Sequence, residues 1–354
     1  MVTESEKAGG LRIWLPAIRA GSGADVFTSR LAEALCRAGH TPLLQWFDHR
    51  YELVPWLLRS VQAPSEIDLV HAGSWQGFAF KRQGIPLIVT EHQYVAHPDF
   101  APYRSLPQAL YHRLFAERWA RHSYADADAV VAVSEFCAVA MRAVLTQPVT
   151  VIHNWVDSDR FKPPETVVVD SPDEGRKAYP LKLLFVGNPS RRKGVDMLPM
   201  IADLLGPAFE LHCLGGLRKA FESRHLPSNM KLMSRTRPEQ MPVVYDSVDI
   251  ALVPSRYEPF GYVALEAMAS GLPVLGFSSS GTSEVCIHGS TALLAPIDDV
   301  SQLVAYARQL AENPGLREKL GAAGRQRAIE CFGEETAVAA YLDVYRRVLK
   351  RPCF

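Results

Sequence analysis

Two glutamates, Glu258 and Glu266, stand on either side of a predicted transition from strand to helix. Residues 250–255 form a short apolar run that ends in Pro-Ser, which is typical of a strand buried inside a parallel sheet. Residues 263–268 are mostly good helix formers, and Gly-Leu-Pro at 271–273 supplies the glycine and proline that commonly end a helix. The pattern predicts that Glu258 lies in a loop and that Glu266 lies on the following helix.

Two carboxylates placed in this way suit the binding of a polar ligand. A helix N-terminus presents free backbone N–H groups, here those of Phe260, Gly261 and Tyr262, to an anion or a hydroxyl. Gly261 has no side chain, which lets a ligand approach closely. Glu258 and Glu266 can then accept hydrogen bonds from two sets of hydroxyls on one elongated molecule. In the alternative, both glutamates are solvated surface charges, as most charged side chains are.

The residues from Glu258 to Glu266 resemble the E-x7-E signature of the family 4 retaining glycosyltransferases, and Pro254-Ser255 and residues 267–274 also follow the family pattern. The resemblance implies the GT-B fold, an α/β architecture of two Rossmann-like, doubly wound parallel-sheet domains that face each other across a cleft. It implies that Glu258 contacts hydroxyls of the donor sugar and that Glu266 holds the ribose of the nucleotide. We assign four further residues of this segment to the donor site: Phe260, Gly261, Tyr262 and Val263.

Composition limits the class of protein. A chain of 354 residues, 48% of them hydrophobic, is long enough to bury two cores. Lysine plus arginine (38) equals aspartate plus glutamate (38), so net charge gives no attraction toward nucleic acid. The six cysteines lack the spacings of a zinc site, and no apolar run approaches the roughly 18 residues that span a bilayer. We expect a soluble, cytoplasmic protein with reduced cysteines and no nucleic-acid partner.

The N-terminal half begins like a doubly wound domain. A predicted strand at 11–16 is followed by a loop of small residues with Gly21 and Gly23, and then by a helix from about 25 to 38. The two glycines lack the third glycine of a dinucleotide-binding fingerprint, so they are equally consistent with a simple tight turn. The resemblance implies that this loop approaches the donor or the acceptor.

Further strands alternate with stretches that can be helical, which predicts a parallel sheet covered on both faces. Ligands bind such sheets beyond the carboxyl ends of the strands, and His92 follows the strand predicted at 85–90. A neutral imidazole there can donate a hydrogen bond to a sugar hydroxyl or to a leaving phosphate. A lone histidine is usually structural, whereas the resemblance matches His92 to a family histidine. Tyr94 and His97, in the polar loop that follows, are assigned to the acceptor side.

A predicted helix from 107 to 124 carries an aromatic stripe of the kind that packs on a core. Its arginines form either a solvated face or a basic patch that contacts anionic lipid heads, as in family members that act on lipid-linked acceptors. The stripe consists of Tyr111, Phe115 and Trp119, and the arginines are Arg113, Arg118 and Arg121. Peripheral contact with the inner face of an anionic membrane is therefore a hypothesis beside the cytoplasmic location.

Asp126 and Asp128 satisfy the D-x-D pattern of metal-dependent glycosyltransferases of another fold. We interpret this as a false match, because the pair opens a predicted strand and no second cluster of acids completes an oxygen cage. The expected site holds no metal, and no cofactor is expected apart from the nucleotide sugar as co-substrate.

The domain boundary is predicted in the proline-rich stretch from 158 to 180. We expect an N-terminal, acceptor-side domain over 1–160 and a donor-binding domain over 161–333. By analogy with the family, the C-terminal helix, about 334–354, packs back on the first domain.

The second domain opens with a strand at 181–187 and a loop that contains Asn188, Arg192 and Lys193. A cation at a glycine-bounded helix start is a common way to neutralise a diphosphate. The resemblance implies that Lys193 binds the donor phosphates beside an arginine at the position of Asn188. Because asparagine stands there, Arg192 is the candidate for the missing charge.

These residues predict a retaining glycosyltransferase that moves a hexose-type sugar from a UDP or GDP sugar to a hydroxyl of a glycan or lipid-linked acceptor. The resemblance places it in the biosynthesis of cell-surface polysaccharide or lipopolysaccharide. Glu258, His92 and Lys193 are the predicted catalytic residues, and cations together with helix amides stabilise the departing diphosphate. The alternatives are another GT-B enzyme, such as a phosphorylase or a nucleotide-sugar epimerase, and a catalytically silent partner of another transferase.

Overall fold

The computed structural model describes residues 10–164, 180–215, 217, 221 and 225–350. The chain forms two compact units, Met1–Asn154 with Glu334–Phe354 (unit 1) and Trp155–Gly333 (unit 2). Residues 155–160 belong to unit 2, whereas the sequence placed them before the boundary. Trp155 is buried, and the Val156 N–H donates to the Phe332 carbonyl, 3.1 Å away. Most of the proline-rich stretch predicted as the linker lies outside the described residues.

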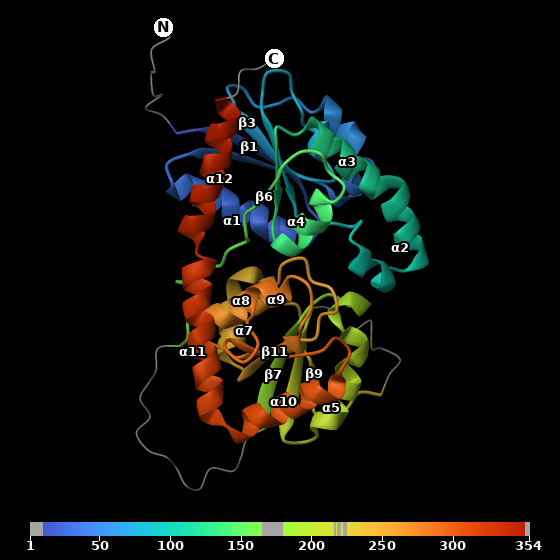
Figure 1. The fold of residues 1–354 in the computed structure, drawn as a ribbon, viewed down its shortest axis with the longest axis vertical. Coiled ribbons are helices and arrows are strands. Elements are labelled where there is room, and N and C mark those ends of the chain that lie inside the picture. The colour runs from blue at the N-terminus through green and yellow to red at the C-terminus, as the bar shows by residue number, and fades with distance from the viewer. Residues whose placement is uncertain (1–9, 165–179, 216, 218–220, 222–224, 351–354) are drawn as a thin grey trace. The chain divides into compact units, whose positions relative to one another are not determined.

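Unit 1 contains a six-stranded parallel sheet of order β2-β1-β3-β4-β5-β6 (Figure 1). Its inner strands are buried along their length, as expected when both faces of a parallel sheet are covered. The strands are β1 Arg12–Ile18, β2 Thr41–Phe47, β3 Leu69–Gly73, β4 Leu87–Glu91, β5 Ala129–Ala132 and β6 Val149–Val151. The α-helices are α1 Gly23–Arg37, α2 Leu106–Tyr111, α3 Glu117–Asp126, α4 Glu135–Arg142 and α12 Glu334–Leu349.

The helix predicted over 107–124 is divided. A π turn, η5 (His112–Ala116), joins α2 to α3, and short 3-10 turns lie between other elements of unit 1. These turns are η1 His49–Glu52, η2 Pro55–Ser60, η3 Gly77–Ala79 and η4 Pro98–Tyr103. The π turn lies where His112 inserts its buried ring among Trp75, Phe100 and Tyr111.

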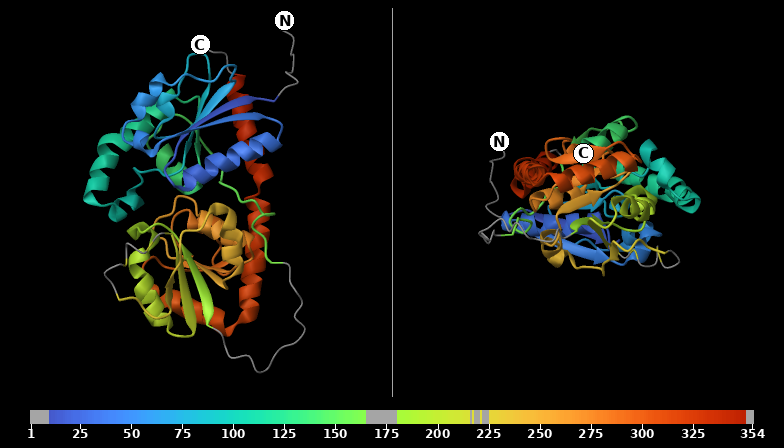
Figure 2. Two further views of the ribbon diagram at one scale, coloured as in Figure 1. Left: turned by 180° about the vertical axis from the view of Figure 1, so that it is seen from behind. Right: turned by 90° about the horizontal axis from the view of Figure 1, so that it is seen from below.

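The last helix, α12, packs on unit 1 (Figure 2). Its Tyr345 hydroxyl lies 2.7 Å from Nδ1 of the buried His71 on β3, and the other ring nitrogen of His71 lies 2.7 Å from Thr90 Oγ1 on β4. Arg37, at the end of α1, donates to the carboxylate of Glu334 at the start of α12, with nitrogen–oxygen distances of 2.6 and 2.7 Å. A hydrogen bond in the core and an ion pair thus attach α12 to the N-terminal segment of unit 1.

Unit 2 repeats the design with strand order β12-β11-β10-β7-β8-β9, again parallel throughout. The strands are β7 Leu181–Val186, β8 Phe209–Leu214, β9 Met230–Leu232, β10 Ile250–Val253, β11 Val274–Phe277 and β12 Ala292–Ala295. The helices are α5 Leu198–Leu205, α7 Met241–Asp246, α8 Tyr262–Ala269, α9 Thr282–Val285, α10 Val300–Glu312 and α11 Pro314–Cys331, and the 3-10 turns are η6 Arg191–Lys193, η7 Val195–Met197 and η8 Pro238–Gln240.

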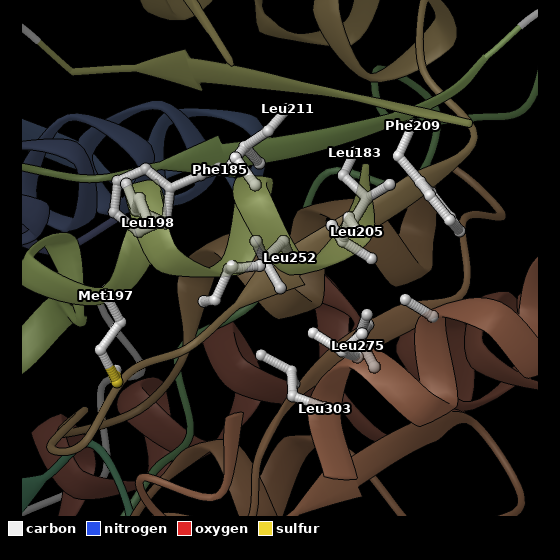
Figure 3. Packing of buried hydrophobic residues seen from close by; sticks show 14 of the residues in the cluster. Leu183, Phe185, Met197, Leu198, Leu205, Phe209, Leu211, Leu252, Leu275 and Leu303 are labelled. Carbon is white, nitrogen blue, oxygen red and sulfur yellow. The ribbon is translucent and has the colours of Figure 1, made fainter. Parts of the chain in front are cut away.

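The core of unit 2 fills the space between one face of this sheet and helices α5 and α10 (Figure 3). Leu183, Leu211 and Leu252 point from three neighbouring strands toward Leu198 of α5 and Leu303 of α10. The two sheets confirm the predicted fold class of doubly wound, parallel α/β domains. No helix within the described ranges is long and apolar enough to cross a membrane.

Burial of His112 makes the stability of unit 1 sensitive to acid. Burial, and to a smaller degree the nearby Arg104, lower the pKa of His112 from 6.5 to about 4. Below pH 6.5 the unfolded chain therefore takes up a proton that the folded chain refuses until about pH 4. The stability that a neutral His112 contributes is complete above pH 6.5 and is lost as the pH falls toward 4.

We predict that His112→Phe, which keeps a ring in this position, flattens the pH dependence of stability. Between pH 6.5 and 4.5 the unfolding free energy of the parent should fall faster than that of the variant, by up to about 1.4 kcal/mol per pH unit. Urea denaturation at half-unit steps measures both profiles. Parallel profiles would show that His112 does not titrate in this way.

Candidate functional site

The candidate site lies at the carboxyl edge of the sheet in unit 2, where the strand order reverses between β7 and β10. Such switch points are the usual ligand sites of doubly wound sheets, because the loops after two adjacent strands diverge there. The loop after β7 leads to residues 190–194, the cation loop, and the loop after β10 is residues 254–261, the glutamate loop. Lys193 and Glu258, which are 65 positions apart in the chain, therefore come into contact.

Lys193 of the cation loop forms an ion pair and a hydrogen bond with Glu258 of the glutamate loop. The two side chains are only 13% and 12% exposed, so each charge depends on the other for compensation. Burial alone would raise the pKa of Glu258, but the charges of Lys193 and then Arg192 outweigh it and lower that pKa. Glu258 is therefore a carboxylate at neutral pH.

A second loop, residues 278–283, fixes the backbone of Glu258. The Glu258 N–H donates to Ser280 Oγ at 2.8 Å, and the Gly281 N–H donates to the Glu258 carbonyl at 2.8 Å. A Cβ on Gly281 would lie 2.6 Å from the Pro259 carbonyl oxygen, so only glycine permits this approach. Glu258 is thus held through both its carboxylate, by Lys193, and its backbone, by Ser280 and Gly281.

Arg192 brings a second cation to this pair. Its Nη1 and the hydroxyl of Ser190 are buried and have no hydrogen-bond partner among the residues that the structure describes. Asn188 is exposed in the loop after β7, and its carbonyl accepts a hydrogen bond from the Ser190 N–H. Arg192 is close enough to the Lys193–Glu258 pair for its charge to lower the pKa of Glu258, and no such effect of Asn188 is found.

The glutamate loop ends at the N-terminus of α8. Gly261 is the N-cap residue with a φ of 114°, a left-handed conformation that favours glycine, and no side chain caps the helix. Phe260 is buried against Phe332, so its side chain belongs to the packing of unit 2. Tyr262 and Val263, both half-buried, form the first turn of α8.

Glu266 lies on α8, as the helical pattern predicted, and is half-buried. Its Oε2 accepts a hydrogen bond from the hydroxyl of Tyr245 on α7, with a distance of 3.2 Å. Tyr245 is fully buried, so it holds the carboxylate in one orientation. The sequence did not predict Tyr245 as a site residue. It lies 21 residues before Glu266 on another helix, and no local pattern shows that the two side chains meet.

The remaining predicted residues lie in unit 1. His92 follows β4, its ring centroid is 4.5 Å from that of Phe27, and burial lowers its pKa to about 4. It is neutral at physiological pH and can act as a hydrogen-bond donor. With His71 and Gly73 it lines a small cavity of about 10 Å³ at the carboxyl ends of β3 and β4.

Tyr94 and His97, assigned to the acceptor side, are both buried. The ring of His97 stacks on Phe136 with a centroid distance of 4.1 Å, and its Nδ1 accepts from the Asp99 N–H at 3.2 Å. Burial raises the pKa of Tyr94 above its ordinary value. Both side chains therefore contribute to the packing of the loop after β4.

The small-residue loop after β1 is organised by Asp25. Its carboxylate accepts from the N–H groups of Ala20 and Gly21 at 3.1 and 2.9 Å. Gly21 has a left-handed φ of 65°, and Gly23 is the first residue of α1, which Ser22 caps. The geometry is that of a tight turn into a helix.

Glu91 is a residue of interest that the sequence did not single out. It ends β4 directly before His92, is 1% exposed, and accepts hydrogen bonds from the Tyr124 hydroxyl and from the Gln93 N–H. Burial raises its pKa, and these hydrogen bonds oppose the rise. The carboxylate closes the turn on which His92 sits.

Comparison with known proteins assigns the family. Residues 41–160 match the model described as "Glycosyltransferase Family 4", and residues 170–327 match "Glycosyl transferases group 1". The chain belongs to family 4 of the glycosyltransferases. This glycosyltransferase is 28% identical over 346 residues to the D-inositol 3-phosphate glycosyltransferase of Streptomyces avermitilis, covering 90% of this chain and 71% of the relative.

Solved structures confirm the GT-B fold of the glycosyltransferase. Sucrose-phosphate synthase from Thermosynechococcus elongatus aligns with a TM-score of 0.78 and 20% identity, over 96% of this chain and 99% of the other. The Anabaena protein HepE, solved with UDP and glucose, aligns with a TM-score of 0.71 and 18% identity, over 95% and 100% of the two chains.

The D-x-D pattern of this glycosyltransferase has a structural explanation. Asp128 pairs with Lys81, whose Nζ lies 2.6 Å from its Oδ2, and the same oxygen accepts from the Leu87 N–H at 2.8 Å. Asp128 therefore anchors the start of β5 to β4. Within the described ranges, histidine, cysteine, aspartate and glutamate side chains form no group of three that could hold a metal ion.

Proposed function

We propose that this glycosyltransferase moves a hexose-type sugar from a nucleotide diphosphate sugar to a hydroxyl of a glycan or lipid-linked acceptor, with retention of anomeric configuration and without a metal. The observation that carries the proposal is the ion pair of Lys193 and Glu258, with Arg192 beside it, at the switch point of unit 2. HepE, solved with UDP and glucose, supports a nucleoside diphosphate and a hexose as ligands.

The cation loop suits the departing diphosphate. Lys193 and Arg192 bring two positive charges against the single carboxylate of Glu258, and Arg192 Nη1 is buried without a partner among the described residues. Backbone amides at the N-terminus of α8 add to this positive field. Cations and dipoles fixed before the reaction stabilise charge as it develops on the leaving group.

The two glutamates suit the hydroxyls of the donor. When a phosphate engages Lys193, the carboxylate of Glu258 becomes an acceptor for hydroxyls of the sugar. Glu266, oriented by Tyr245, accepts hydrogen bonds from the ribose. His92, which is neutral, is assigned as a hydrogen-bond donor to a sugar hydroxyl or to the leaving phosphate. We assign no covalent nucleophile: in the proposed front-face route, the leaving phosphate takes up the proton of the acceptor hydroxyl.

We also propose that the enzyme works as a peripheral protein at an anionic membrane on the cytoplasmic side, which suits a lipid-linked acceptor in the biosynthesis of cell-surface polysaccharide or lipopolysaccharide. The supporting observation is an apolar surface on unit 1, formed by the η1–η2 segment and by α2 with the π turn. It exposes seven large apolar side chains: Leu53, Trp56, Leu57, Leu106, Leu110, Leu114 and Phe115.

Contacts join the two parts of this apolar surface. The Tyr111 hydroxyl of α2 donates to the Glu52 carbonyl, and the ring of Trp56 lies 6.0 Å from that of Trp119 on α3, the helix that follows the π turn. Figure 2 shows α2 standing away from the sheet of unit 1, and Leu106 at its start is 88% exposed. The exposed arginines on these elements and on the following helix α3 are Arg50, Arg59, Arg113, Arg118 and Arg121. An apolar surface flanked by arginines complements a bilayer with anionic headgroups.

The reaction predicts release of nucleoside diphosphate that depends on acceptor. A panel of UDP and GDP sugars is first screened for slow hydrolysis, and the donor found is then tested with hydroxyl acceptors. Release should rise when acceptor is added and should persist in excess EDTA. Release of sugar phosphate on addition of inorganic phosphate would instead indicate a phosphorylase. Interconversion of the donor alone would indicate an epimerase, and donor binding without turnover would indicate a silent partner.

We predict that Glu258→Ala and Lys193→Ala abolish transfer while the protein stays folded. Each change removes one half of the pair that holds the sugar or the leaving group, and a loss of about a hundredfold or more in kcat is expected for a lost electrostatic stabiliser. Glu312→Ala, which removes an exposed acid at the C-terminal end of α10, is the control and should retain activity. Turnover near that of the parent in both site variants would refute the assignment.

Membrane contact predicts sedimentation with anionic vesicles. The parent should pellet with vesicles of phosphatidylcholine and phosphatidylglycerol, and less with phosphatidylcholine alone. Leu110→Glu, or the triple change of Arg113, Arg118 and Arg121 to glutamate, should abolish pelleting, whereas Val243→Glu, at an exposed apolar residue of unit 2, should not. A parent that stays in solution, or variants that pellet equally, would exclude this surface.

A further inference from the structure

Arg256 lies in the glutamate loop two residues before Glu258 and is only 8% exposed. Its guanidinium binds groups from two other loops. Nη1 donates to the Arg191 carbonyl at 2.8 Å and to Asp196 Oδ1 at 2.6 Å, both after β7. Nε donates to Asp298, which lies after β12. One side chain therefore connects the loops that follow three strands.

The backbone beside Arg256 strengthens the same connection. The N–H groups of Arg256 and Tyr257 both donate to the Arg192 carbonyl, at 2.8 and 3.3 Å. The carbonyls of Arg191 and Arg192 are thus both bound by the glutamate loop. Gly194 completes the approach, because a Cβ there would collide with the Pro254 carbonyl oxygen. We call these contacts of the glutamate loop the clamp. They hold Arg192 and Gly194, the residues directly before and after Lys193.

We propose that Arg256 is a positioning residue that holds the cation loop in register with Glu258, so that Lys193 and Arg192 converge on one anion. The inference rests on the proposed function, since it assigns this loop to the donor diphosphate. Arg256 does not itself supply charge to that anion, because Asp196 and Asp298 already pair with it.

A clamp is needed because adjacent cations repel each other. Without it, Arg192 and Lys193 would move apart toward solvent when no ligand is present. Only arginine suits the position: its planar fork of donors reaches a carbonyl and two carboxylates at once, whereas the single ammonium of lysine is a point charge. Asp196 and Asp298 are 38% and 54% exposed, so water can solvate them once Arg256 is replaced. Loss of the clamp should therefore displace the loop without unfolding unit 2.

The test separates affinity for phosphates from affinity for the rest of the nucleotide. Titration calorimetry first identifies whether the parent binds UDP or GDP, and the matching nucleoside is measured beside it. For Arg256→Lys and Arg256→Gln, we expect the diphosphate affinity to fall by about tenfold or more, as a misplaced charge-assisted hydrogen bond implies, while nucleoside affinity stays unchanged. The donor KM should rise in parallel.

Arg325→Lys is the matched control. Arg325 is another partly buried arginine of unit 2, and the hydrogen bonds that it makes to described residues go to backbone carbonyls outside the cation loop, those of Ser158, Phe161 and Ala269. This variant should lose thermal stability to a similar degree and keep the diphosphate affinity of the parent. A general structural role for Arg256 would instead lower nucleoside and diphosphate affinity together, which would overturn the inference.

The remaining outcomes are also decisive. If the parent binds no nucleoside diphosphate, the proposed function fails before the clamp is tested. If the parent binds it and the Arg256 variants bind it equally well, the clamp alone is refuted. Should both variants fail to fold, Asp298→Gly removes one anchor, and glycine readily adopts the left-handed φ of 67° at this position. It should show a smaller loss of diphosphate affinity, and affinity equal to that of the parent would refute the clamp.

Discussion

The site depends on a charge imbalance that the fold keeps out of water. Arg192 and Lys193 face the single carboxylate of Glu258, so one positive charge is left over in a place with little solvent. Burial lowers the pKa of Lys193, Glu258 raises it, and Arg192 lowers it again. Buried charges are costly unless they are compensated. A site of this kind gains most from an anionic ligand, because the anion supplies the missing compensation.

The sheet creates this imbalance by bringing two loops to one edge. Strands β7 and β10 are neighbours in the sheet, although β8, β9 and the helices around them come between the two strands in the chain. Asp249, directly before β10, accepts from the Lys182 N–H at 2.8 Å, which fixes the two strands at their amino ends as well. Core side chains, Leu183 and Leu252 among them, hold both strands against α5 and α10. The hydrophobic core thus sets where the cation loop and the glutamate loop begin. Gly194 lets the cation loop approach Pro254, and Gly281 lets its loop approach Pro259.

Sequence patterns predicted the parts of the molecule that depend on local order. The strand, loop and helix around Glu258 and Glu266 follow from an apolar run, turn residues and helix formers, and the structure has them in that order. Contacts between distant side chains did not follow. Tyr245 reaches Glu266 across 21 residues, and Arg256 reaches Asp298 across 42. The π turn at His112 also escaped prediction, because it depends on rings from other elements that surround this histidine.

The position of Glu258 explains why a carboxylate suits the proposed reaction better than a neutral acceptor. Without a donor, Glu258 keeps Lys193 charged and in place, so the cation needs no rearrangement when the ligand arrives. A phosphate then replaces one anionic partner of Lys193 with another, and little further desolvation is required. The released carboxylate is a stronger hydrogen-bond acceptor for sugar hydroxyls than an amide would be. In the proposed reaction, binding of the leaving group and orientation of the sugar are therefore coupled through one ion pair, that of Lys193 and Glu258.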